Sequence, residues 1–385
     1  MKKQVFILAS ALLLASCGGS NAPAFSEKPG VPVEDIKELK APLEKLSQSF
    51  ASTKKIGFEV RATESIDASF RTVANADLGL KDATYPIKSS GNLSAKAGFD
   101  FENVKASASA EGKVSASAKI PSVSVDENYS ASVKDTDINV PETSLSAKAY
   151  VDDNRIYADI SGAKSGIKTI LTEAGKSGLF DVSSAVSAID EIPGKFKSPA
   201  IPEEALSTIK TLPDTIGQYI NTYGQLLVSF VDAFSSMSVE SGQLDLSKII
   251  KAEKVDNDYR IALDATLNDL APIFSGLLES YLGEGVGELV SAALKVIDAK
   301  VHFSITFNEQ ALVSVNLSLD ASVKNLKLSD VLGAEIGAAV DAIVTDINLA
   351  ASFAVGIDFK YGDAVAIEAL SEADKANFPE LASAE

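Results

Sequence analysis

The feature that most constrains this chain is a two-residue hydrophobic alternation that runs from about residue 55 to residue 161. Apolar and polar residues exchange places at nearly every step, for example in 58–62 and in 104–110. Because successive side chains of a β-strand point to opposite faces, this pattern predicts antiparallel strands with one covered and one wet face. Short polar breaks at Glu111-Gly112 and at Asp152-Asp153-Asn154 predict hairpin turns between the strands.

Helical patterns stand before and after this stretch. Residues 33–50 carry apolar residues at three- and four-residue spacing, which predicts an amphipathic helix that Pro42 kinks or splits. A helix is also expected from about Asp214 to Met237, after Pro213. Three further helices are expected at 268–281, 286–298 and 329–344. Long strand patterns return at 255–266, 301–307, 313–323 and 347–359.

Runs of strands mixed with runs of helices predict an α+β fold. We expect a large curved antiparallel β-sheet of about nine to twelve strands, rich in meanders, with helices packed on one face. This single body covers residues 33–370, with a possible division into a meander at 33–161 and a helix-rich half at 162–370. The acidic tail at 371–385 is expected to be disordered.

The start of the chain has the pattern of an export signal. Two lysines precede an apolar run of eleven residues at 5–15, which is shorter than the roughly 20 residues needed to cross a bilayer. The sequence Leu14-Ala15-Ser16-Cys17 is similar to the lipobox of bacterial lipoproteins. That resemblance implies a signal peptide at 1–16, lipid such as palmitate on Cys17, and a membrane as the partner. The alternative is an ordinary signal with a chance cysteine, but Cys17 is the single cysteine of the chain.

Residues 17–32 are rich in Gly, Pro, Ser and Asn, and we expect a flexible tether there that spans roughly 20–25 Å. The expected location is the cell envelope: the outer membrane of a two-membrane host, or the outer face of the cytoplasmic membrane of a one-membrane host. The formal net charge of −18 would repel phosphates, so we expect no nucleic-acid partner.

Residue types that carry chemistry are sparse. His302, the single histidine, stands between Val301 and Phe303 on the strand face opposite the apolar residues. One histidine and one lipidated cysteine do not make a zinc site, and no Gly-x-Ser-x-Gly motif accompanies a serine triad. We therefore expect a solvated strand histidine rather than a catalytic one.

Two other patterns favour simple structural interpretations. The sequence Gly283-Glu284-Gly285-Val286-Gly287 lacks the lysine of a phosphate loop and favours a corner between helices. The sequences Asp152-Asp153-Asn154 and Asp256-Asn257-Asp258 could hold calcium, but they lack EF-hand spacing and favour hairpin turns. We predict no metal, no cofactor and no enzymatic activity.

The apolar strand faces hold the candidate binding residues. Inward positions in 91–160 are largely Ala and Val, which would let a helix approach closely or leave a shallow trough. Later strands supply bulky residues instead, and the candidate ligand-binding residues are Phe303, Phe307, Phe353 and Phe359. A sheet with thin and bulky regions under helices could enclose an apolar cavity. The alternative is a filled core of uneven thickness, because native interiors rarely leave voids larger than a water molecule.

The order of elements over about residues 33–361 resembles the LolA/LppX-like lipoproteins: an N-terminal helix, a strand meander, inserted helices and late long strands. The resemblance implies a half-open antiparallel sheet closed by helices, with a cavity that carries lipid or lipidated protein. We expect a membrane-anchored, non-enzymatic lipoprotein that binds an apolar or amphiphilic ligand. Two alternatives stay open: a structural or surface-interaction lipoprotein with a filled core and a protein partner, and a hydrolase with an unrecognised carboxylate site.

Overall fold

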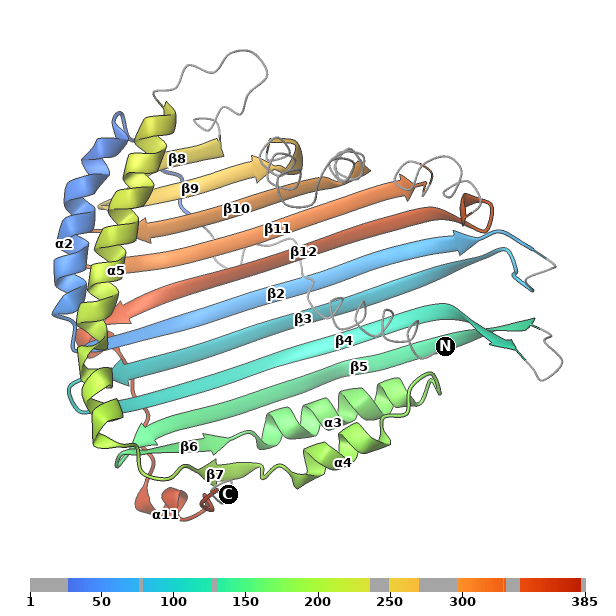
Figure 1. The fold of residues 1–385 in the computed structure, drawn as a ribbon, viewed down its shortest axis with the longest axis horizontal. Helices are drawn as coiled ribbons and strands as arrows, with labels where there is room; N and C mark the ends of the chain where they lie inside the picture. Colours follow the sequence, from blue (N-terminus) through green and yellow to red (C-terminus); the bar gives the residue numbers. More distant parts are fainter. Residues whose placement is uncertain are drawn as a thin grey trace.

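The computed structural model describes residues 27–75, 79–125, 131–235, 249–269, 296–327, 329 and 340–381. Within these residues twelve strands form one open antiparallel sheet, in the order β1-β8-β9-β10-β11-β12-β2-β3-β4-β5-β6-β7 (Figure 1). The expected α+β fold with a large curved antiparallel sheet is confirmed. The predicted export signal and Cys17 lie outside the described residues, as does most of the three predicted helices at 268–281, 286–298 and 329–344.

Two meanders share this sheet. The first consists of β2 (Lys55–Thr72), β3 (Ala83–Asp100), β4 (Lys105–Val125), β5 (Ala131–Asp152), β6 (Arg155–Asp159) and β7 (Lys195–Lys197). The second consists of β8 (Ile250–Val255), β9 (Asp258–Thr266), β10 (Asp298–Phe307), β11 (Leu312–Leu326) and β12 (Val344–Tyr361), with β1 (Val31–Pro32) at its edge. Because β12 pairs with β2 along almost its whole length, the two meanders form one continuous surface.

The hairpin predicted at Glu111-Gly112 is wrong, because both residues lie inside β4. Gly112 pairs with Leu93 of β3 and with Leu145 of β5. A Cβ atom on Gly112 would stand 2.5 Å from the carbonyl oxygen of Asn92. This glycine therefore allows a close approach of two backbones and does not form a turn.

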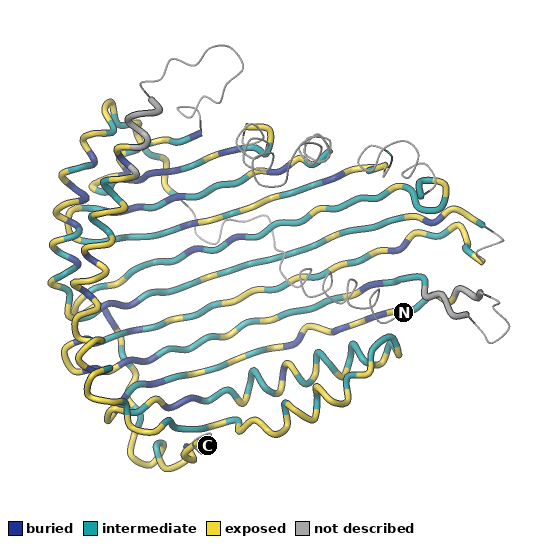
Figure 2. The backbone as a smooth tube through the Cα atoms, viewed as in Figure 1, coloured by how far each residue is buried: buried dark blue, intermediate teal, exposed yellow. Residues whose placement is uncertain are grey.

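Cross-strand register separates an apolar face from a polar face. One row of apolar-face residues crosses eight strands: Leu263, Phe303, Leu317, Val355, Ala62, Leu93, Gly112 and Leu145. The adjacent row, one residue along each strand, belongs to the polar face: Asp264, His302, Ser318, Ala354, Thr63, Asn92, Lys113 and Ser144. Figure 2 shows that most strand residues are only partly buried. The alternation predicted from the sequence thus sorts side chains between two faces of one thin layer.

Two helices cross the apolar face at one end of the strands, α2 (Lys40–Ala51) and α5 (Glu203–Ser235). The larger core cluster joins them to β9 and β10 and contains Leu39, Leu43, Leu46, Val228, Ile261 and Phe307. A second cluster contains Phe50, Ile56 and Phe101. The buried core of the described chain is therefore concentrated at the helix-covered end, where two layers meet.

Two prolines show where sequence and structure differ in helix boundaries. The helical pattern at 33–50 is split into a 3₁₀ turn, η1 (Ile36–Leu39), and α2, with Pro42 in the first turn of α2. A proline costs little in a first turn, because that N–H has no intrahelical acceptor. Pro213 instead lies inside α5, which starts at Glu203 and not at the predicted 214.

Two further helices, α3 (Ser161–Gly175) and α4 (Ser183–Glu191), lie beside β5 and the short edge strands. Glycine permits the close contact of α3 with β5. A Cβ atom on Gly166 would stand 2.4 Å from Leu145 Cδ2 and 2.5 Å from the Ser144 carbonyl oxygen.

Both ends of the described chain lie on the polar face. Residues 27–32, assigned to the tether by sequence, contact the sheet through Glu27 and pair β1 with β8. Residues 362–378 follow β12 through η2 (Gly362–Ala364) and α11 (Glu372–Lys375), and Val365 lies over Gly57 and Gly98. Phe378 packs on Tyr150 and Tyr157 at the far edge. Part of the segment predicted to be a disordered tail thus lies against the sheet.

Candidate functional site

A groove of about 350 Å³ opens on the apolar face, beyond the end that α2 and α5 cover. Small residues line its floor: Ala62, Gly91, Ala110, Gly112 and Ala147. Larger side chains bound it, namely Leu93, Val114, Leu145 and Phe353, and Ala163 contributes from α3. The Ala-rich strands therefore leave the shallow trough that was one of the two possibilities raised by their composition.

Leucines beside this groove are exposed to an unusual degree for one sheet face. Leu93 is 44% exposed, Leu317 is 38% exposed and Leu319 is 41% exposed. Leu317 and Leu93 lie in the same cross-strand row, with Val355 and Ala62 between them. The groove thus continues as an apolar surface from β3 to β11, and a contiguous exposed apolar patch on a protein is typical of a binding surface.

Helix α5 presents a second apolar surface beside the sheet. Five exposed residues follow one another at four- and three-residue spacing: Leu212, Ile216, Tyr219, Tyr223 and Leu226. The Tyr219 and Tyr223 rings stack with their centroids 5.9 Å apart. This spacing places all five side chains on one stripe of the helix.

The stripe is turned away from α2. Gly217 and Gly224 face α2, while Ile209 and Ile220 pack against the cluster that contains Ile56. With 3.6 residues per turn, the stripe lies on the flank next to the sheet contact and far from the α2 contact. Figure 1 shows α2 on one side of α5 and the long run of the strands on the other. Helix α5 therefore forms a wall beside the apolar face.

The four phenylalanines predicted to bind a ligand all belong to the apolar face, but the structure does not bring them together. Phe307 is 1% exposed and lies in the core under α2. Phe359 packs against the second core cluster. Phe303 is half-buried in the row between Leu263 and Leu317, and Phe353 lines the groove. Phe353 is thus the one of the four with a place in the groove.

The polar face carries a cluster around His302 that the sequence did not reveal. Glu27 Oε1 lies 3.3 Å from His302 Nε2, accepts a hydrogen bond from Ser304 Oγ, and accepts a second from Asn316 Nδ2 at 2.8 Å. Its other oxygen lies 3.2 Å from Arg260 Nη1. Ser304 is fully buried, and Arg260 and Asn316 are each 7% exposed. His302 does lie on the polar face as predicted, but in an ionic network and not in solvent alone.

Two carboxylates on β8 and β9 hold the cations of this cluster in place. Asp264 Oδ1 lies 2.6 Å from His302 Nδ1, and Arg260 Nε donates to Glu253 Oε2 at 2.9 Å. Hydrogen bonding to Glu27 and then to Asp264 raises the pKa of His302 to about 9, so the imidazole is protonated at neutral pH. Burial opposes ionisation of Glu27, but hydrogen bonds from His302 and Ser304 outweigh burial and lower the pKa of Glu27 to about 2.

These two pKa shifts predict how stability depends on pH. The contribution of His302 is complete below its ordinary pKa of 6.5 and is lost as the pH rises through about 9. The contribution of Glu27 is complete above 4.5 and is lost as the pH falls towards about 2. The free energy of unfolding measured by urea titration should therefore fall by roughly 1–2 kcal/mol as the pH rises from 6.5 to about 9, after allowance for solvent screening. His302→Gln should reduce that fall, and an equally steep fall in the variant would contradict the assignment.

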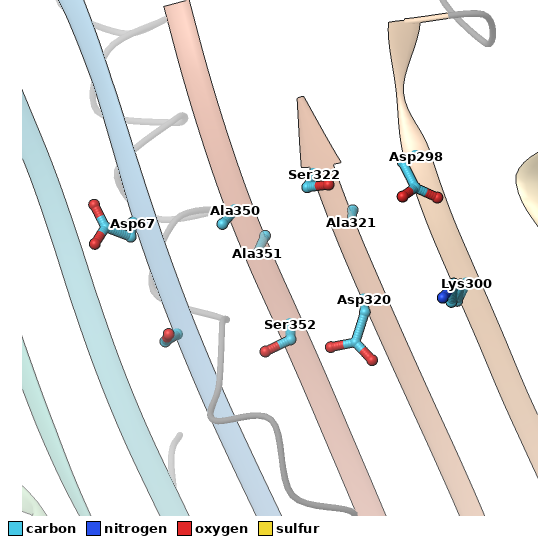
Figure 3. A pocket seen from close by; sticks show the side chains of 10 residues that line it. Asp67, Asp298, Lys300, Asp320, Ala321, Ser322, Ala350, Ala351 and Ser352 are labelled. Carbon is cyan, nitrogen blue, oxygen red and sulfur yellow. The ribbon is translucent and has the colours of Figure 1, made fainter. Parts of the chain in front are cut away.

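A second hollow, of about 460 Å³, lies on the polar face, towards the end of the strands that is opposite α2 and α5 (Figure 3). Asp67, Asp298 and Asp320 come from three different strands, with Lys300 opposite Asp320 and serines and alanines between them. Among the described residues, no group of three His, Cys, Asp or Glu side chains is arranged to hold a metal ion. The hollow carries no assigned chemistry.

The two Asp-Asn motifs form tight turns between strands. Asp153 and Asn154 both have positive φ, at 48° and 57°, in the two-residue turn between β5 and β6. Asp256 has a φ of 55° in the turn between β8 and β9. Lys375 of α11 binds both Asp152 and Asp153. The hairpin interpretation of these motifs is confirmed, whereas the Gly283–Gly287 motif lies outside the described residues.

No protein-family model and no curated protein matches this chain. Among solved structures, the V. cholerae type IV competence pilus secretin PilQ aligns at 9% identity over 94% of this chain and 82% of that chain, with a TM-score of 0.10. A similarity that weak carries no argument about fold or function. In the described part of the chain, none of the helices has the length and apolarity required of a membrane span.

Proposed function

We propose that this chain is a membrane-anchored, non-enzymatic lipoprotein of the cell envelope that binds an apolar or amphiphilic ligand on its apolar face. The observation that carries the proposal is the groove on that face together with the exposed Leu93, Leu317 and Leu319 beside it. Full burial of one leucine side chain is worth roughly 1.5–3 kcal/mol. A ligand that covered several of these side chains would gain much of that free energy.

The charges around the groove narrow the class of ligand. Two charged residues of the described chain line it, Glu64 and Glu111, but Glu111 pairs with Ser94 and Ser146 in the polar-face register, so Glu64 is the one that lines it from the apolar face. Glu64 lies on the apolar face, with its carboxylate over Gly91, where an added Cβ would stand 2.6 Å from Oε1. Because no lysine or arginine is found among the described residues that line the groove, electrostatics favours a neutral head group over an anionic one. We therefore propose a neutral amphiphile, such as an acylglycerol, as the preferred class.

The membrane anchor in this proposal rests on the lipobox-like sequence that ends at Cys17. Lipid on Cys17 would hold the protein at the outer membrane of a two-membrane host, or at the outer face of the cytoplasmic membrane of a one-membrane host. Mass spectrometry of the protein from the producing bacterium would test this directly. An acylated N-terminal cysteine is the expected result, and an intact signal sequence or an unmodified thiol would contradict it.

Ligand binding is tested with protein that lacks residues 1–17. Native mass spectrometry should find copurifying lipid, and fluorescence titration should show saturable binding of a labelled monoacylglycerol, weaker for a labelled fatty acid of equal chain length. Ala62→Phe places a ring on the groove floor and should weaken binding about tenfold or more, which corresponds to about 1.4 kcal/mol.

Ser90→Phe is the matched control, because Ser90 is exposed on the polar face three residues from Leu93, opposite Ser65 of β2, and is not one of the residues that line the groove. The control should bind as the parent does. Absence of copurifying lipid together with no uptake of either probe would contradict the proposed function. Equal loss of binding in both variants would contradict the placement of the ligand in the groove.

One observation favours the surface-interaction alternative, namely the exposed stripe on α5 from Leu212 to Leu226. Tyr219 and Tyr223 in this stripe are of a residue type that is enriched in protein interfaces. Tyr219→Ser combined with Tyr223→Ser separates the two ideas. Loss of lipid uptake would assign the stripe to the wall of the ligand site, whereas retained uptake with loss of a specific crosslinked partner would favour a protein interface.

A further inference from the structure

Among the described side chains, four hydrogen-bond donors from three adjacent strands converge on one carboxylate. Arg260 comes from β9, His302 and Ser304 from β10, and Asn316 from β11, and all four contact Glu27. Two of these donors are cationic, since the raised pKa of His302 keeps the imidazole protonated. This combination of an arginine, a cationic imidazole, a hydroxyl and an amide is typical of a receptor for a carboxylate.

The donors belong to the sheet and are held there without help from Glu27. Ser304 stands opposite Asn316 in the β10–β11 register, and His302 stands opposite Asp264 in the β9–β10 register. Asp264 binds the second nitrogen of His302, and Glu253 binds Arg260. Such supporting contacts fix the direction of a binding group before its ligand arrives. The receptor is therefore expected to persist when Glu27 is absent.

The segment that carries Glu27 has few other attachments nearby. Lys28 pairs with Asp256, but both side chains are about 70% exposed, at 73% and 69%. The Lys28 carbonyl oxygen accepts from Arg260 at 2.8 Å, and β1 contributes two paired residues at the sheet edge. An exposed ion pair is worth roughly 0–1 kcal/mol. Val33 N also donates to Ala252 O at 2.9 Å, so β8 holds the segment from residue 31 onward and the Glu27 carboxylate is its side-chain contact with the cluster of donors.

We propose that Arg260, His302, Ser304 and Asn316 form a carboxylate-binding site, which Glu27 occupies in cis and which accepts the carboxylate of another molecule when Glu27 withdraws. The site lies on the face opposite the apolar groove, so it does not depend on the proposed lipid binding. Its ligand class is an acidic peptide side chain, because that is the chemistry of its resident occupant. Exchange of this ligand would detach Glu27 from the polar face while β1 stays paired with β8.

The single histidine of the chain makes the site directly observable. NMR titration of the His302 ring should give a pKa near 9 in the parent protein. Glu27→Ala should lower the proton affinity of His302 by about tenfold or more, because the carboxylate 3.3 Å from Nε2 is lost while Asp264 remains on Nδ1. Acetate, used as the carboxylate probe, should then bind to the variant saturably and restore part of the lost proton affinity.

Glu34→Ala is the matched control, since Glu34 is an exposed residue of the same segment. In that variant and in the parent protein, acetate should have no more effect on His302 than chloride at equal ionic strength. Glu27→Gln, which retains hydrogen bonding without charge, should lie between parent and alanine variant. An unchanged His302 pKa in Glu27→Ala would overturn the site, and equal effects of acetate and chloride would overturn its exchangeable character. Groove binding of the labelled monoacylglycerol should be the same in all three variants, so failure here is distinct from failure of the proposed function.

Discussion

Replacing Arg260 with alanine is expected to lower the free energy of unfolding by about 3–5 kcal/mol. The guanidinium is the cation nearest to both Glu27 and Glu253, and its Nη2 binds Glu253 Oε2 directly. Those carboxylates are only 21% and 16% exposed. Removal of Arg260 would leave them partly desolvated beside each other, which costs more than the loss of the original attraction.

Urea denaturation followed by circular dichroism measures this change. Lys28→Ala provides the contrast, because it removes a cation from the same region but from an exposed pair with Asp256, and it should cost much less stability than Arg260→Ala. Arg260→Lys should fall between the two, since an ammonium group cannot bond both carboxylates in the planar geometry of a guanidinium. Similar losses for Arg260→Ala and Lys28→Ala would show that the ionic network around Glu27 contributes little to the free energy of unfolding.

The second large effect is expected from Phe307→Ala, at about 3–5 kcal/mol. Phe307 is 1% exposed and packs with Leu39, Leu43 and Leu46 where the helices meet the sheet. Its ring centroid lies 6.0 Å from that of Tyr259. Truncation would leave a cavity between two packed layers, and the surrounding strands, paired on both sides, could close it only in part.

Phe353→Ala is the informative partner of that variant. Both phenylalanines lie on the apolar face, but Phe353 is half-buried and lines the groove. We expect Phe353→Ala to cost less than half as much stability as Phe307→Ala and to weaken uptake of the labelled monoacylglycerol. Thermal and urea unfolding measure the first quantity, and the fluorescence titration measures the second. Equal destabilisation by the two truncations would indicate that the groove is part of a continuous core, as the filled-core alternative requires.

Arg260→Ala tests the polar face of the sheet, and Phe307→Ala tests its apolar face. The sheet is covered by α2 and α5 at one end, while Leu93, Leu317 and Leu319 remain exposed farther along. The polar face gains its burial from the two ends of the described chain, through Glu27 and through residues such as Val365. Stability is therefore concentrated at the helix-covered end and at the Glu27 cluster, and the groove, lined mainly by β2 to β5, lies outside both regions.

Local pattern was sufficient to predict the fold class. The side chains of a strand alternate whatever the strand pairs with, so the apolar positions of β2 to β6 and of β9 to β12 were readable from the sequence. The same argument correctly placed His302 on the polar face and the Asp153-Asn154 turn at a hairpin. It failed at Gly112, because a glycine that lets two backbones approach and a glycine that makes a turn look alike in sequence.

What only the tertiary structure decided is which of these residues meet. Glu27 and His302 are 275 positions apart, and no local preference of either residue indicates that they are neighbours. Likewise the four phenylalanines share a face by alternation, but strand register and the position of α2 and α5 divide them between core and groove. Periodicity determines the direction of a side chain, since that depends on the backbone of its own strand. Pairing between distant strands determines its neighbours, because that is set by the packing of the whole sheet.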